Sequence, residues 1–107
     1  MLMSRFEKIC FQGHTHIPGL FVESGSFITP EQRDYHFRLD NDKCMINVGS
    51  VGQPRDGDPR SCFVVSDTEE KTIEYHRVEY DVETTRQKIH AVPELDNMLG
   101  DRLMTGR

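Results

Sequence analysis

Short apolar runs bounded by turn-forming residues constrain the fold of this 107-residue chain more than any other feature. The run Ile9-Cys10-Phe11 is soon followed by Gly13, and the stretch 43–48, with Cys44-Met45-Ile46 at its centre, ends at Gly49. Runs of this length with such flanking residues are typical of strands. Two further runs flank the polar stretch 67–71 and predict a hairpin. We expect strands at 8–12, 20–22, 35–39, 43–48, 61–66 and 72–80.

Helical patterns occur near the C-terminus. Asp81 suits the N-cap of a helix that continues to His90 or Val92 and ends before Pro93. A second short helix is expected at 94–103, where Gly100 weakens it. The pattern therefore predicts an α+β fold, a mostly antiparallel sheet with C-terminal helices.

The tetrapeptide Gly13-His14-Thr15-His16 directly follows the first expected strand. On an extended backbone, residues two apart point to the same side, with Cα atoms about 6–7 Å apart. That span suits one metal ion, or two ions about 3.5–4 Å apart. Gly13 is expected to let the backbone leave the strand in a conformation that other residues avoid. The alternative is a polar turn with two surface histidines.

The composition excludes some classes of function. The formal net charge of −5 argues against a chain that coats nucleic acid. No stretch approaches the roughly 18 apolar residues of a membrane span, and Glu7 and Lys8 interrupt the start where a signal peptide would be apolar. Cys10, Cys44 and Cys62 form no CxxC pair, so we expect reduced, buried thiols in a cytoplasmic protein.

Two motifs carry a family resemblance. The stretch 11–19 contains Gly-His-Thr-His, and Ile46-Asn-Val-Gly-Ser-Val-Gly-Gln-Pro-Arg55 follows it, then Asp56-Gly-Asp-Pro-Arg60. This order resembles the C-terminal portion of calcineurin-like metallophosphoesterases, in particular their small single-domain phosphodiesterase branch. The family's other metal-binding motifs precede Gly-His-x-His, and residues 1–12 contain none of them. The resemblance implies that residues 1–107 form the C-terminal part of one phosphoesterase domain, half of a four-layer αββα sandwich.

The resemblance also implies a chemistry. Family members hydrolyse phosphate mono- or diesters at a site that holds two divalent metal ions when complete, of the Mn, Fe, Zn or Ni type. His14 would bind one ion and His16 the other. Because most of the ligands are absent, this chain alone is expected to hold metal weakly and to be inactive, and no catalytic residue is assigned.

Three residues are candidates for binding a phosphate-ester substrate. Arg55 follows Pro54 in a loop, where its guanidinium suits a phosphate; alternatively, it pairs with Asp56 or Asp58. Asn47 and Ser50 could bind substrate or, alternatively, hold the local backbone. His36, His76 and His90 stand alone in strand and helix patterns and are expected to be structural.

A second class of function stays open. The chain could be a non-catalytic interaction module that keeps the sheet and pairs an exposed edge with another polypeptide. That polypeptide could be a separate N-terminal half that carries the missing motifs.

Overall fold

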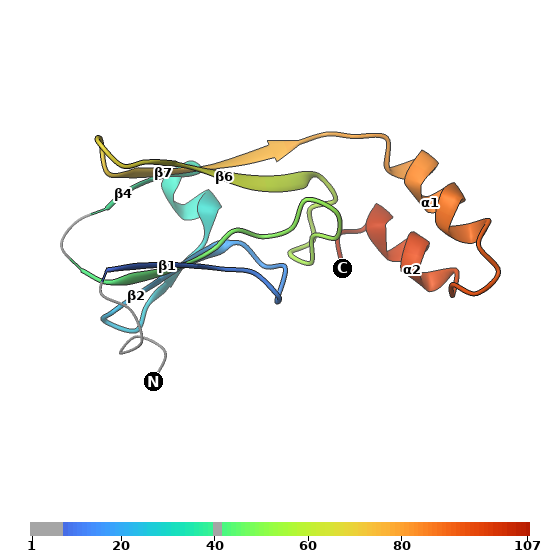
Figure 1. Ribbon diagram of the computed structural model, residues 1–107, viewed down its shortest axis with the longest axis horizontal. Coiled ribbons are helices and arrows are strands. Elements are labelled where there is room, and N and C mark those ends of the chain that lie inside the picture. The colour runs from blue at the N-terminus through green and yellow to red at the C-terminus, as the bar shows by residue number, and fades with distance from the viewer. Residues whose placement is uncertain (1–7, 40–41) are drawn as a thin grey trace.

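The structure, a computed structural model, describes residues 8–39 and 42–107. Expectations for the first seven residues lie outside these ranges. Two sheets face each other, and a pair of helices extends from one end (Figure 1). The first sheet has the strand order β1 (Ile9–Gln12), β5 (Cys44–Asn47), β2 (Gly19–Val22), β3 (Phe27–Ile28). The second has the order β4 (His36–Arg38), β7 (Thr72–Val78), β6 (Ser61–Asp67).

The core lies between the two sheets. Leu20, Cys44 and Ile46 from the first sheet meet Phe37, Ile73 and Tyr75 from the second, and each is at most 5% exposed. Residues two apart on a strand share a face, so these alternating apolar positions bury one face of each sheet. Phe37 and Tyr75 make an edge-on aromatic contact within this core.

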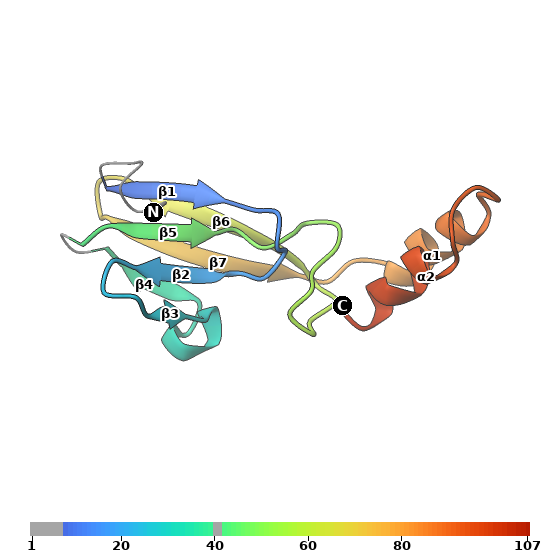
Figure 2. The same cartoon turned by 90° about the horizontal axis from the view of Figure 1, so that it is seen from below.

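The pairing of β1 with β5 decides where the histidines lie. Every other strand pair is antiparallel, whereas β1 and β5 run parallel, with Gln12 opposite Asn47. Parallel strands end at the same edge of a sheet. The loop after β1, which carries His14 and His16, therefore lies beside the loop after β5 (Figure 2).

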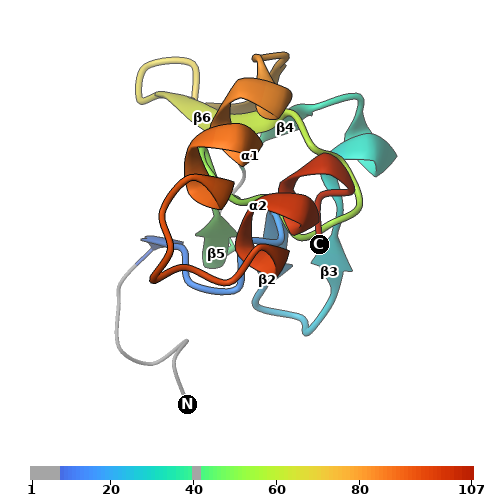
Figure 3. The same cartoon turned by 90° about the vertical axis from the view of Figure 1, so that its right-hand side faces the viewer.

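The C-terminal helices form an arm. α1 (Val82–His90) and α2 (Met98–Asp101) pack against each other (Figure 3). The 3₁₀ turn η3 (Arg102–Met104) follows α2, and the chain ends on the side of the arm that faces the sheets (Figure 1). α1 has no buried residue. Among the described residues, no helix is long and apolar enough to cross a membrane.

The expected α+β fold is confirmed, with three differences in detail. The chain supplies strands to both sheets, whereas the pattern pointed to a single sheet. The strand β3 and the 3₁₀ turn η2 (Pro30–Arg33) lie between residues 22 and 35, where no strand or helix was expected. The second helix begins at Met98, four residues later than predicted, because residues 94–97 form a turn in which the Asp96 carboxylate accepts a hydrogen bond from the Met98 N–H at 2.9 Å.

Candidate functional site

The histidine loop is turned back on itself, not extended. The Thr15 N–H donates to the Gly13 carbonyl at 3.0 Å, which closes a three-residue turn around His14. His14 has φ 76° and His16 has φ 62°. The expectation of an extended backbone is therefore wrong, and the histidines, not Gly13, take the left-handed conformation. Such a backbone costs about 1–3 kcal/mol per residue and persists where its surroundings enforce it.

Asn47 enforces the turn from the end of β5. Its amide nitrogen donates to the Thr15 hydroxyl at 2.8 Å and to the Gly13 carbonyl at 3.3 Å, and its amide oxygen accepts from the Gly49 N–H at 3.0 Å. Asn47 is only 4% exposed. These contacts favour the structural alternative for Asn47 over substrate binding, because its polar atoms already hold the histidine loop.

His16 is oriented by a backbone group. Its Nδ1 lies 2.7 Å from the Gln53 carbonyl oxygen. A carbonyl oxygen only accepts hydrogen bonds, so Nδ1 carries the proton and Nε2 keeps its lone pair in the neutral ring. Metal-binding histidines characteristically donate their second ring nitrogen in this way. This acceptor lies in the main chain, where a sequence pattern carries no signal for it.

His14 and His16 supply imidazole donors, which are suitable for part of a metal site. Imidazole nitrogen suits Zn, Fe and Ni, and the orientation of His16 leaves Nε2 available for such an ion. Within residues 8–39 and 42–107, no three His, Cys, Asp or Glu side chains form a group that could hold a metal ion. The one Asp-x-His sequence, Asp34-Tyr35-His36, lies at the start of β4, where His36 is 4.0 Å from Glu74.

Ser50 and Arg55 lie in the loop after β5. The Ser50 hydroxyl accepts from the Gln53 N–H at 2.8 Å, which favours a role in shaping the loop. The exposed Arg55 donates from Nη2 to the Gln53 side chain at 2.8 Å. Its neighbouring aspartates pair with other arginines, so the alternative of an Arg55 ion pair with Asp56 or Asp58 is not what the structure has. Gln53 therefore contacts both residues: its carbonyl contacts the His16 ring, and its side chain contacts the Arg55 guanidinium.

The residues that follow Arg55 in the sequence form an ion-pair network with Arg77 of β7. Asp56 accepts a hydrogen bond from Arg77 Nη2, and Asp58 lies 3.7 Å from Arg77 Nε. Asp58 also binds Arg60, with 2.7 Å between Oδ2 and Nη2. The hydrogen bond from Arg60 lowers the pKa of Asp58 below its ordinary value. Arg77 lies in the segment expected as the strand 72–80, and its side chain is only 2% exposed, which the strand pattern alone does not reveal.

His76 and His90 lie away from the histidine loop, whereas Cys62 lies against the loop after β5, where its N–H donates to the Ser50 carbonyl at 2.9 Å. His76 stacks on Phe63 and is 3.4 Å from Glu74, and His90 is 2.9 Å from Asp101 on the helical arm. All three cysteines are free thiols. Cys62 is buried, and burial raises the pKa of its thiol to about 11. It therefore stays protonated near neutral pH and is a poor nucleophile.

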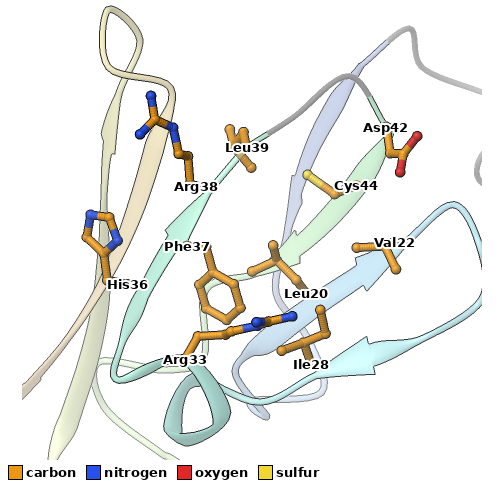
Figure 4. Close-up of a pocket in the computed structure, with 10 residues that line it drawn as sticks. All are labelled: Leu20, Val22, Ile28, Arg33, His36, Phe37, Arg38, Leu39, Asp42 and Cys44. Atoms are coloured by element: carbon orange, nitrogen blue, oxygen red, sulfur yellow. The ribbon is translucent and has the colours of Figure 1, made fainter.

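A cavity of about 390 Å³ opens between β4 and the first sheet, away from the histidine loop. Figure 4 shows the Arg33 side chain, one of the residues that line this cavity, extending past Phe37 toward Leu20 and Ile28. The cavity lies near Cys44, at the start of β5, whereas Asn47 and the histidine loop lie at the other end of β5. No residue predicted for the site lines it.

Two known proteins are similar to this chain. A crystal structure of a metallophosphoesterase from Sphaerobacter thermophilus matches with a TM-score of 0.78 and 30% identity, over 92% of this chain and 42% of that one. The structural likeness supports the metallophosphoesterase superfamily. The chain is also 42% identical, over 103 residues, to the uncharacterized protein MJ0912 of Methanocaldococcus jannaschii. No family model matches the sequence.

The chain spans less than half of either relative. It covers 41% of MJ0912 and 42% of the Sphaerobacter metallophosphoesterase. Its fold is consistent with half of a metallophosphoesterase fold, built from two mainly antiparallel sheets.

Proposed function

We propose that this chain contributes His14 and His16 as metal ligands to a site that hydrolyses phosphate mono- or diesters. The hydrogen bond from His16 Nδ1 to the Gln53 carbonyl carries the proposal, because it presents Nε2 of a neutral imidazole to a ligand. The left-handed backbone at both histidines supports it, since strained residues cluster at functional sites. Divalent metal ions at such a site polarise the phosphoryl oxygens and lower the pKa of water.

We propose that Arg55 binds the phosphate group. Arg55 is exposed, and its backbone N–H donates to the His16 carbonyl at 3.1 Å, so the backbones of these two residues are held side by side. A guanidinium can donate two parallel hydrogen bonds to phosphate oxygens. Asn47 and Ser50 then act by holding the loops on which these groups stand.

We propose further that the remaining ligands come from polypeptide that carries the family's upstream motifs, in the same or a separate chain. Strand β1 supports this view, because among the described strands it stands at the edge of the first sheet and pairs with β5 on one side only. The alternative function, a module that pairs through this edge without catalysis, rests on the same observation. Activity decides between them.

The test is a chimera in which this chain replaces the matching 42% of the Sphaerobacter metallophosphoesterase. With Mn²⁺, we expect it to hydrolyse bis(p-nitrophenyl) phosphate or p-nitrophenyl phosphate, whereas the 107-residue chain alone has no turnover above buffer. His14→Ala or His16→Ala should lower kcat/KM about a hundredfold or more, because several kcal/mol of charge stabilisation are lost. Arg55→Ala should mainly raise KM.

His76→Ala is the matched control, because His76 lies on β7 against Phe63. It should retain the activity of the parent chimera, and circular dichroism should show every variant folded. A folded His16→Ala variant with nearly full activity would show that the metal site is elsewhere. An inactive chimera with native-like melting would favour the interaction module.

A further inference from the structure

The segment 53–55 holds His16 from two sides. The Gln53 carbonyl accepts from His16 Nδ1 at 2.7 Å, and the Arg55 N–H donates to the His16 carbonyl at 3.1 Å. Pro54, between them, is buried and restricts the backbone. The direction of the His16 ring therefore depends on where this segment stands.

The residues that follow anchor this segment. Asp56 is adjacent to Arg55 and is hydrogen-bonded to Arg77, whose side chain is 2% exposed. Gly57 donates from its N–H to the Gly106 carbonyl at 2.8 Å. Asp58 lies between Arg77 and Arg60. The loop is thus fixed to β7 and to the C-terminal end by charged and backbone contacts.

Arg77 is the centre of this anchor. It lies on β7, opposite Cys62 on the neighbouring strand β6, and so belongs to the second sheet. Its Nε and Nη1 atoms are buried and have no hydrogen-bond partner among the described residues. A buried cation of this kind needs its carboxylates, because removing one partner leaves an uncompensated charge. Arg77 and the two aspartates therefore hold one another in a single arrangement.

We propose that Arg77 is a positioning residue for His16, acting through Asp56 and the segment 53–55. The second sheet thereby sets the tautomer and direction of an imidazole on the first sheet. Arg77 touches neither a metal ion nor substrate in this role. The inference rests on the proposed function only in taking His16 to be a metal ligand, since the contacts between Arg77, Asp56, the segment 53–55 and His16 are all within this chain.

The test measures the His16 tautomer in the metal-free 107-residue chain by long-range ¹H–¹⁵N NMR at pH about 8.5, where an ordinary imidazole is neutral. The parent chain should show a protonated Nδ1 and an unprotonated Nε2. Arg77→Met removes the charge but keeps a long, unbranched side chain at this buried position, and should convert His16 to a mixture of tautomers. Arg77→Lys keeps the charge and should retain most of the Nδ1–H form.

Arg86→Met is the matched control, because Arg86 pairs with Glu83 and Asp101 on the helical arm. It should leave the His16 spectrum unchanged. Should Arg77→Met fail to fold, Asp56→Asn replaces it, and a smaller change in the same direction is expected. A parent-like His16 tautomer in either folded variant would overturn the proposal, whatever the loss in melting temperature, since a purely structural Arg77 would change the melting temperature alone.

This measurement is independent of hydrolysis. If His16→Ala keeps its activity in the chimera while Arg77→Met changes the tautomer, the proposed function fails and the positioning contact stands. If His16→Ala loses its activity in the chimera while Arg77→Met leaves the tautomer unchanged, His16 remains a metal ligand and the positioning role of Arg77 is wrong.

Discussion

Tyr75 joins the two sheets at the end where the histidines lie. Its hydroxyl accepts a hydrogen bond from the Gly19 N–H at 3.1 Å and lies within donating distance of the Gly19 and Asn47 carbonyls. The ring is 3% exposed, and burial raises the pKa of the hydroxyl above its ordinary value. Asn47 is therefore held by its backbone from the second sheet while its side chain holds the histidine loop.

Tyr75→Phe should lower the free energy of unfolding by about 1–3 kcal/mol, because it leaves buried backbone groups without a partner. Urea unfolding of the 107-residue chain measures the change. Tyr80→Phe is the control, since the Tyr80 hydroxyl is buried without a hydrogen-bond partner among the described residues. Its removal should be neutral or slightly stabilising, and equal losses in both variants would contradict the role of Tyr75.

The α1 element depends on its cap more than on burial. The Asp81 carboxylate accepts from the Thr84 N–H at 3.1 Å and from the Thr84 hydroxyl at 2.6 Å. The hydroxyl contact lowers the pKa of Asp81 below its ordinary value. Because no α1 residue is buried, little apolar packing replaces these contacts if they are lost.

Asp81→Ala should loosen the helical arm and leave the sheets intact. Amide hydrogen exchange in the first turns of α1 should become roughly fivefold faster, as expected for the loss of an N-cap. Exchange in β5 and β7 should stay as in the parent. Glu94→Ala, an exposed substitution beyond the helix, is the control, and faster exchange throughout the sheets of Asp81→Ala would contradict a local role.

At the scale of the whole molecule, the ion-pair network couples the two sheets to the C-terminal end. Asp58 is 22% exposed, contacts Arg60 and Arg77, and lies against Gly106. A side chain added at Gly106 would come within 2.7 Å of the Asp58 backbone. The helical arm therefore returns to the loop that follows the proposed phosphate-binding Arg55.

Acid should weaken this coupling. The pKa of Asp58 is lowered in the folded chain, chiefly by the Arg60 hydrogen bond, whereas the unfolded chain has the ordinary value of 3.8. As the pH falls below about 4, the unfolded state therefore binds more protons at Asp58 than the folded state does. The stability that Asp58 contributes at neutral pH is lost as the pH falls through the pKa that Asp58 has in the folded chain.

Asp58→Asn should flatten this part of the pH dependence and reduce stability at neutral pH. Urea midpoints measured between about pH 2.5 and 7 for both proteins test the prediction. Parallel curves for the parent and the variant would show that Asp58 does not carry the acid sensitivity.

Local features of this chain were predictable from the sequence. α1 begins after Asp81 and ends before Pro93, and the histidine loop directly follows a strand, as predicted. Caps and turns form between residues a few positions apart, so the local sequence contains both partners. The metal role of His14 and His16 and the phosphate role of Arg55 stay predictions.

Tertiary structure alone decided how the histidines are presented. Asn47 reaches Gly13 across 34 residues, Gln53 reaches His16 across 37, and Asp56 meets Arg77 across 21. These contacts exist because β1 and β5 end at the same edge and the second sheet closes over them. The periodicity of a strand indicates which face is buried, but not which distant carbonyl or carboxylate a buried polar group will meet there.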